Sequence, residues 1–329
     1  MKNLGLILLS SILIIFSGCS SKKYYEPEET YSVTIDEYDT GAQIVDFHSN
    51  GATLENNYFI THQGVSNIKL EEDFRFLTQD EDTVISTNDN GVLAVTKNGQ
   101  TEKIEFEKNI VAASTNRGLI AFIMIDNSIA LYDLKEKKTV FKNYFNLSML
   151  NDIRIASPIF LNTLVLFPTL DGKVVIVDKL RKTVYKTVNL DPKSDVNNIT
   201  YLKAIGSTLI AATNNKLFSF VNGVVKIVSE DIRSVTSNDK SIFVATLDGR
   251  IVKYNHLLKK QGETKFQYAN FYALAYGDHL YALESQDYLI QLDDNLENFE
   301  VYDFSFDEED KVFAIDDTIY FEDSYIVLK

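Results

Sequence analysis

The sequence predicts an all-β protein, an eight-bladed β-propeller built from four-stranded antiparallel blades. Three observations predict this fold. The 329 residues include 18 Tyr and 21 Phe but only 14 Gly and 4 Pro, a composition that favours strands. No long amphipathic helical pattern is present. Turn signals flanked by apolar runs recur at intervals close to 40 residues, which is the length of one propeller blade.

The clearest blade lies between residues 153 and 190. Residues 153–158 and 164–169 are predicted as its first two strands. The turn Asp171-Gly172 follows, since glycine accepts the positive φ that a tight hairpin needs. An unbroken β-branched run predicts the third strand at 173–178, and alternation over 183–190 predicts the fourth. These four strands make one complete blade.

The same pattern predicts seven further blades along the chain. The first interval, from Gly64 to Gly91, is 27 residues long, and the later intervals run from 34 to 45. Each signal is predicted to join the second and third strands of its blade. The signals are Gln63-Gly64, Asn90-Gly91, Asp126-Asn127, Asp171-Gly172, Asn214-Asn215, Asp248-Gly249, Gln286-Asp287 and Glu322-Asp323. The predicted blades are 42–72, 73–107, 109–147, 153–190, 198–230, 232–268, 270–306 and 310–329.

The last predicted blade has room for only three strands before the chain reaches Lys329. A three-stranded blade would leave an unpaired edge in the ring. Residues 31–36, with the alternating sequence YSVTID, are predicted to supply the fourth, outer strand and to close the propeller. The alternative is that they extend the polar stretch 20–30, which is predicted to be a tether. With the closing strand included, the sequence predicts a single domain over 31–329.

The N-terminus has the features of a bacterial lipoprotein signal peptide over residues 1–18. A 13-residue apolar run, too short to span a bilayer, ends in Phe16-Ser17-Gly18-Cys19. This ending resembles the lipobox, in which the cysteine is acylated. Cys19 is the only cysteine in the chain, so it has no partner for an internal disulfide. The alternative is an ordinary signal peptide with an incidental cysteine.

The position after Cys19 and the charge of the chain bear on location and partners. If the cell has two membranes, Ser20 in place of Asp resembles the sorting rule that sends lipoproteins to the outer membrane, and this predicts an anchor on its periplasmic face. The formal net charge is −15, which disfavours binding to nucleic acid.

The acidic run Asp307, Glu308, Glu309 and Asp310 lies between two predicted blades. It is either a contact for a basic partner or a solvated loop.

The chain carries none of the sequence signals that mark common catalytic or metal sites. Its four histidines, at 48, 62, 256 and 279, do not pair at metal-ligand spacing. No P-loop or dinucleotide fingerprint is present, and residues 64–68 lack the second glycine of a nucleophile elbow. The sequence therefore predicts a protein that is not an enzyme and holds no metal or cofactor.

One motif indicates a family. Ala156-Ser157-Pro158, Asp171-Gly172, Asp178 and Tyr185 together resemble the repeat of PQQ-type quinoprotein propellers, with a weaker copy at Asp248-Gly249 and Tyr254. These repeats usually carry tryptophan near the last strand, and this chain has none. Tyr185, Phe141 and Phe106 are candidates for that packing position. The missing tryptophan also argues against a quinone cofactor.

An eight-bladed propeller of this repeat type on a lipoprotein is similar to the BamB family of outer-membrane barrel-assembly lipoproteins. The resemblance implies a non-enzymatic scaffold, monomeric within a complex, that binds the barrel-assembly machinery and assists insertion of outer-membrane proteins. Two other hypotheses stay open. One is a quinoprotein-like or hydrolytic envelope enzyme, which needs a polar cluster on the propeller axis. The other is a surface-exposed binding protein.

Overall fold

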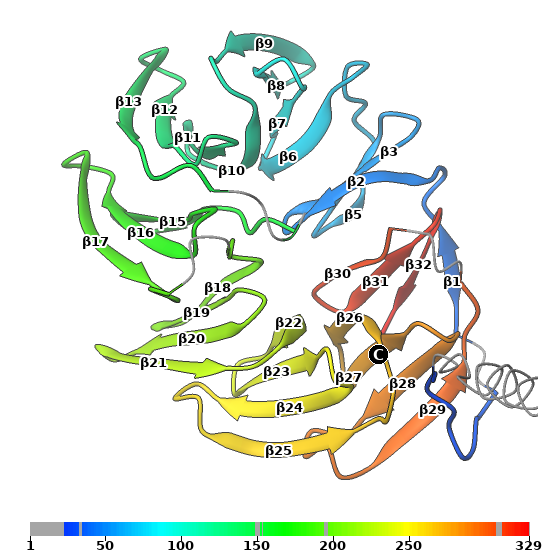
Figure 1. The fold of residues 1–329 in the computed structure, drawn as a ribbon. Helices are drawn as coiled ribbons and strands as arrows, with labels where there is room; N and C mark the ends of the chain where they lie inside the picture. The colour runs from blue at the N-terminus through cyan, green and yellow to red at the C-terminus, as the bar shows by residue number, and fades with distance from the viewer. Residues whose placement is uncertain are drawn as a thin grey trace, which may run out of the picture.

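The chain forms a closed ring of eight blades, as the sequence predicts (Figure 1). The computed structural model describes residues 23–32, 35–148, 152, 154–193, 197–306 and 311–328. Every blade is a four-stranded antiparallel sheet, and the described residues include no helix. In blades one to seven the four strands follow one another along the chain. Blade eight takes its outer strand from the other end of the chain.

The first four blades span residues 44–189. Blade one consists of β2 (Ile44–His48), β3 (Gly51–Leu54), β4 (Phe59–Thr61) and β5 (Gly64–Val65). Blade two consists of β6 (Arg75–Asp80), β7 (Thr83–Thr87), β8 (Val92–Lys97) and β9 (Gln100–Glu105). Blade three consists of β10 (Ile110–Asn116), β11 (Leu119–Met124), β12 (Ile129–Asp133) and β13 (Lys138–Asn143). Blade four consists of β14 (Ile159–Leu161), β15 (Leu164–Pro168), β16 (Lys173–Asp178) and β17 (Thr183–Asn189).

The other four blades complete the ring. Blade five consists of β18 (Tyr201–Ile205), β19 (Thr208–Ala212), β20 (Lys216–Val221) and β21 (Val224–Ser229). Blade six consists of β22 (Ile232–Ser237), β23 (Ser241–Thr246), β24 (Arg250–Asn255) and β25 (Lys260–Lys265). Blade seven consists of β26 (Phe271–Tyr276), β27 (Leu280–Glu284), β28 (Tyr288–Leu292) and β29 (Phe299–Asp303). Blade eight consists of β30 (Phe313–Ile315), β31 (Thr318–Phe321), β32 (Ser324–Val327) and β1 (Glu37–Asp39).

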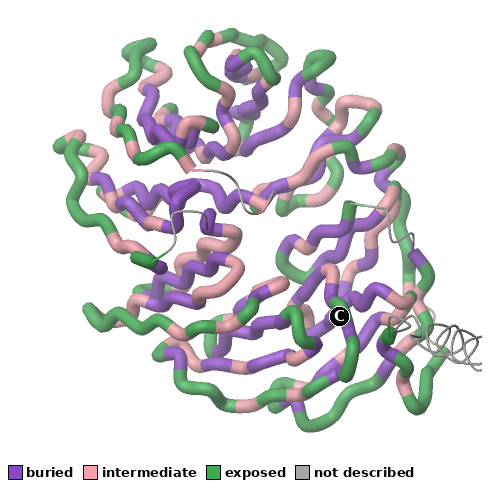
Figure 2. The backbone as a smooth tube through the Cα atoms, in the orientation of Figure 1, coloured by how far each residue is buried: buried purple, intermediate pink, exposed green. Residues whose placement is uncertain are grey.

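The hydrophobic core is divided into eight layers, one between each pair of neighbouring blades. The second strand of a blade is covered on both faces, so β7, β19, β23 and β27 are buried at every residue. Outer strands such as β9 and β21 are mostly exposed. Figure 2 shows the buried residues concentrated in the middle of the blades and exposed residues along their outer strands. Each blade therefore depends on both of its neighbours for burial.

Seven of the eight turn signals join second and third strands, as predicted, and the signal in blade one does not. Gln63-Gly64 joins β4 to β5, the third and fourth strands. The second and third strands of blade one are joined by residues 55–58 instead. A glycine turn indicates a hairpin but does not say which hairpin of the blade it closes. This error accounts for the short first interval of 27 residues.

The first strand of blade four begins later than predicted. The prediction of 153–158 is wrong, because the strand is β14 at Ile159–Leu161. The preceding residues use their backbone donors elsewhere. Ala156 N donates to Ile199 O at 3.0 Å, and Ser157 N donates to Ser49 Oγ at 2.9 Å. Pro158 has no N–H to contribute to a strand ladder.

The ring is closed by an N-terminal strand, as predicted, but not by residues 31–36. The closing strand is β1 (Glu37–Asp39), which pairs with β32 in the register Tyr38 to Tyr325. The rings of these two tyrosines stack at 5.2 Å. Tyr31 instead forms a parallel bridge with Tyr302 of blade seven. Every residue of β1 is exposed, so no apolar alternation marks this strand in the sequence.

Candidate functional site

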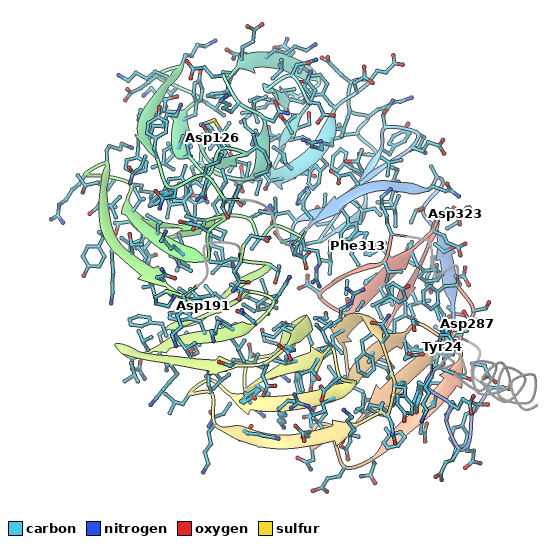
Figure 3. All side chains as sticks on the ribbon, in the orientation of Figure 1. Tyr24, Asp126, Asp191, Asp287, Phe313 and Asp323 are labelled. Carbon is cyan, nitrogen blue, oxygen red and sulfur yellow. The ribbon has the colours of Figure 1, made fainter. Side chains whose placement is uncertain are left out.

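A cavity of about 870 Å³ lies around the propeller axis. Its walls come from blades one and four to eight, mainly from their inner strands β2, β14, β18, β22, β26 and β30. Phe313, labelled in Figure 3, lines the cavity and stacks on Phe47 of blade one at 5.3 Å. A central cavity of this kind is where propellers with small-molecule or peptide ligands hold them.

A contact across the ring bounds the cavity on one side. Ser49, which follows β2, donates from Oγ to Ser157 Oγ of blade four at 3.0 Å. The next residue, Asn50, donates from Nδ2 to Leu77 O at 3.1 Å and to Ala113 O at 3.0 Å. One turn of blade one thus binds blades two, three and four. The cavity is consequently displaced toward blades five to eight.

Arg154 and Arg233 line the cavity, and together with Asp152 they form what we call the arginine cluster (Asp152, Arg154 and Arg233). Arg154 Nε donates to Asp152 Oδ1 at 2.9 Å, and a second nitrogen of the same guanidinium contacts Asp152 Oδ2. Arg154 also donates to the backbone oxygen of Arg233. Arg233 Nε donates to Phe271 O at 2.9 Å, and its guanidinium lies 5.8 Å from the ring centre of Tyr272.

The electrostatics of the arginine cluster favour an anion. Burial alone would raise the pKa of Asp152, but hydrogen bonds and charge from Arg154 outweigh burial and hold that pKa below its usual value. Burial and the neighbouring charge of Arg154 lower the pKa of Arg233. Among the described residues, Arg233 has no carboxylate within ion-pair distance. The cluster thus contains two guanidinium groups and one carboxylate, which pairs with Arg154, so it has an excess of positive charge.

The opposite end of the cavity is polar and more open to solvent. His62 Nδ1 lies 2.8 Å from Asp316 Oδ2, which joins blades one and eight. This hydrogen bond lowers the pKa of Asp316. Asp316 directly follows β30, whereas Arg233 is the second residue of β22. Because inner strands of a propeller run in the same direction around the axis, the two groups lie at opposite ends of the cavity.

The residues predicted as sites from the sequence fall outside the described residues. Cys19 and the acidic run Asp307, Glu308, Glu309 and Asp310 are all in the undescribed ranges, so lipidation and partner contact stay predictions. Within the described ranges no group of three His, Cys, Asp or Glu side chains could hold a metal. His48 is buried, with Nε2 2.7 Å from Phe76 O, and burial lowers its pKa.

The predicted substitutes for tryptophan divide into two groups. Phe106 packs between blades two and three, with ring centroids 4.8 Å from Phe122 and 5.9 Å from Tyr132. Phe141 packs against the core layer between blades three and four. These two confirm the prediction. Tyr185 is 68% exposed on the outer strand β17, so the prediction for that residue is wrong.

Sequence reasoning missed the arginine cluster, although a signal for it exists. The tripeptide Asp-Ile-Arg occurs twice, at 152–154 and 231–233. The first copy precedes β14, the inner strand of blade four, and the second overlaps the start of β22, the inner strand of blade six. A charged tripeptide repeated close to two inner strands indicates residues near the axis.

No family model matches the chain. It is 26% identical to the plasminogen-binding protein PgbB of Helicobacter pylori strain J99, over 91% of this chain and 65% of that protein. The PgbB of strain 26695 is also 26% identical, over 91% of this chain and 64% of the other. The chain thus spans a little less than two thirds of the length of these curated relatives.

Solved structures with the same fold include proteins of several kinds. BamB from Moraxella catarrhalis superposes with a TM-score of 0.65 at 15% identity, covering 90% of this chain and 98% of that one. The C-terminal WD40 domain of Sif2 gives 0.64 at 12% identity, covering 91% and 99%. Sqt1 of Saccharomyces cerevisiae gives 0.61 at 11% identity, covering 91% and 98%. At these identities the likeness shows the eight-bladed fold alone. In the described residues, no helix is long and apolar enough to span a membrane.

Proposed function

We propose that this protein is a lipid-anchored, non-enzymatic propeller that binds other proteins at the bacterial cell envelope, with plasminogen as the first partner to test. The observation that carries the proposal is the relationship to PgbB. It extends over 91% of this chain, so it includes nearly the whole propeller rather than one repeat. The predicted acylation of Cys19 would supply the anchor.

The geometry of the axial cavity supports a binding role. A rigid ring presents its loops on two faces, and such faces suit protein contacts. The arginine cluster offers guanidinium groups that form paired hydrogen bonds with a carboxylate. An acidic side chain or the C-terminal carboxylate of a partner would therefore fit against Arg154 and Arg233.

The direct test measures binding of plasminogen to the purified mature protein by surface plasmon resonance, with serum albumin as the control ligand. We expect saturable binding with a Kd of about 1 μM or tighter for plasminogen and none for albumin. Absence of binding by a preparation that unfolds cooperatively would reject plasminogen as the partner.

A second candidate function is a scaffold in outer-membrane barrel assembly. It is favoured by the eight-bladed fold that BamB shares over nearly its whole length, together with the predicted lipoprotein signal and Ser20. The two functions require opposite sides of the outer membrane. Protease treatment of intact cells distinguishes them, because a plasminogen binder is digested and a periplasmic scaffold is protected. Crosslinking in cells then tests whether the barrel-assembly protein is captured.

A further inference from the structure

The segment Lys23–Tyr31, which we call the N-terminal strap (residues 23–31), is docked on the propeller. The sequence predicts a polar tether over 20–30, yet Tyr25 is only 8% exposed. Its ring meets those of Phe266 and Tyr288 edge-on, with both centroids at 5.8 Å. Tyr25 thereby joins the core layer between blades six and seven, and burial raises its pKa to about 12.

Both ends of the strap are also fixed. At the N-terminal end, Lys23 Nζ donates to Tyr268 OH at 3.2 Å and lies 5.2 Å from the centre of that ring. At the C-terminal end, Thr30 Oγ1 donates to Asp303 Oδ2 at 3.1 Å, and Tyr31 N donates to Val301 O at 2.8 Å. The strap runs beside β29 toward β1 (Figure 1).

The docked strap leaves very little free chain between the propeller and Cys19. Only three residues, 20–22, separate Cys19 from Lys23, so the Cα atoms of Cys19 and Lys23 lie at most about 14 Å apart when the chain is fully extended. If the tether were free up to Tyr31, eleven residues would separate Cys19 from Tyr31 and the reach would be about 43 Å. An acyl chain on Cys19 would therefore hold the rim between blades six and seven close to the bilayer.

The side chains at this rim suit a membrane surface. Tyr24 and Tyr268 are each 46% exposed, and Tyr24 lies beside the turn of blade seven that contains Asp287 (Figure 3). Tyrosines with an apolar ring and a polar hydroxyl are enriched where protein meets lipid headgroups. Lys23 places one positive charge at the end of the strap nearest Cys19, whereas Glu26, Glu28 and Glu29 lie farther along it.

We propose that the N-terminal strap orients the propeller at the membrane, with the rim around Tyr25 and Tyr268 facing the lipid headgroups. This inference rests on the lipid anchor of the proposed function but not on the identity of the bound protein. In this orientation blade two, on the far side of the ring from blades six and seven, points away from the bilayer (Figure 1). The partner-binding surface would then be held at a fixed angle to the membrane, which a flexible tether would not achieve.

The test uses the full lipoprotein reconstituted in vesicles of phosphatidylethanolamine and phosphatidylglycerol that contain a headgroup quencher. Single cysteines are introduced by Gln267→Cys, in the loop beside Tyr268, and by Gln100→Cys, on β9 of blade two. Both positions are exposed. A fluorophore labels only the introduced thiol, because acylation occupies Cys19. We expect strong quenching at 267 and little at 100, and equal quenching at both positions would overturn the proposal.

Two further variants test whether the strap is the cause. Tyr25→Ser should abolish the difference in quenching between positions 267 and 100. The exposed Tyr185→Ser, on the outer strand of blade four, should leave that difference unchanged. Inserting about 12 Gly and Ser residues between Ser21 and Lys22 lengthens the free chain without touching the propeller, and it should also abolish the difference. A difference that survives either Tyr25→Ser or the insertion would show that the strap does not set the orientation.

The same preparation separates this inference from the proposed function. Mass spectrometry of the N-terminal peptide reports acylation of Cys19, and an unmodified peptide would overturn both the anchor and the orientation. Plasminogen binding measured on the same protein reports the partner alone. Loss of plasminogen binding with the quenching difference intact would reject the partner and keep the orientation.

Discussion

At the scale of single residues, the glycines in the turns between second and third strands meet two separate requirements. Gly249 has φ of +81°, which only glycine adopts without strain. In addition, a Cβ at this position would lie 2.3 Å from Phe266 O, in the connection to blade seven. The turns at Gly91 and Gly172 have the same close approach, to Phe106 O and Asn197 O. The sequence predicts the φ requirement but not the contact with the next blade.

Gly249→Ala and Gly99→Ala separate these two requirements. Gly99 has a similar φ of +74°, but a Cβ there meets nothing within 4 Å. We expect Gly99→Ala to lower the free energy of unfolding by about 1–2 kcal/mol through backbone strain alone. Gly249→Ala should lose about 1–3 kcal/mol more, because the methyl group displaces the neighbouring connection. Denaturant unfolding measures both, and equal losses would refute the role of the connection.

Glu284 is a fully buried carboxylate at the end of β27. Asn270 N donates to its Oε1 at 2.8 Å and Gln286 N donates to its Oε2 at 2.7 Å. Burial raises the pKa of Glu284, and these hydrogen bonds only partly offset that effect. The folded state therefore binds a proton more tightly than the unfolded state. The contribution of Glu284 to stability is greatest below its ordinary pKa of 4.5 and falls as the pH rises through the raised value.

The stability of the variant Glu284→Gln, measured as a function of pH, tests whether Glu284 loses its stabilising effect as the pH rises. The glutamine cannot titrate, and its amide nitrogen cannot accept the second backbone donor, so the variant should lose about 1–3 kcal/mol at low pH. The difference in unfolding free energy between the wild type and the variant should narrow between pH 4.5 and 8. Urea unfolding at several pH values measures it. For the control variant Glu107→Gln, at an exposed position, the difference in unfolding free energy from the wild type should not change with pH. If the difference for Glu284→Gln also stayed constant with pH, it would contradict the burial argument.

At the scale of strands and turns, the sequence predicts what lies inside a blade better than what lies at its edge. The β-branched run 173–178 and the turn Asp171-Gly172 occur where predicted, because the second and third strands of a blade are covered by neighbouring blades and are apolar on both faces. Outer strands face solvent and carry little pattern. The alternating sequence of 31–36 predicts the closing strand in the wrong place. The strand that forms is β1, whose register is fixed by Tyr38 stacking on Tyr325.

Two truncations test the role of β1 in closing the ring. A chain that begins at Ile35 keeps β1, and a chain that begins at Ala42 lacks it and exposes the edge of β32. We expect the longer chain to stay monomeric and to unfold in one transition. The shorter chain should unfold at a lower temperature and form dimers through the open edge. Calorimetry and light scattering measure the two properties, and indistinguishable behaviour would show that β1 is dispensable.

At the scale of the whole molecule, the axial cavity depends on contacts that no local pattern encodes. The sequence places Arg154 and Arg233 in blades four and six, 79 positions apart. Only the closed ring brings Arg154 against the backbone of Arg233, and Arg233 against Phe271 of blade seven. The contact between Ser49 and Ser157 likewise joins blades that are not neighbours. Fold class and blade count are therefore predictable from repeats, whereas the site is a consequence of closure.

The arginine cluster should dominate binding of an acidic partner segment, because the rest of the protein is negatively charged. Arg233→Gln removes the guanidinium without adding bulk, and we expect it to weaken plasminogen binding about tenfold, or about 1.4 kcal/mol. Arg233→Lys should recover part of the loss, since it keeps the charge but not the paired donors. Arg181→Gln, at an exposed turn of blade four that pairs locally with Asp178, should bind as the wild type does. Surface plasmon resonance at two salt concentrations measures these affinities. An unchanged affinity for Arg233→Gln, with an unchanged unfolding temperature, would place the partner on another face of the ring.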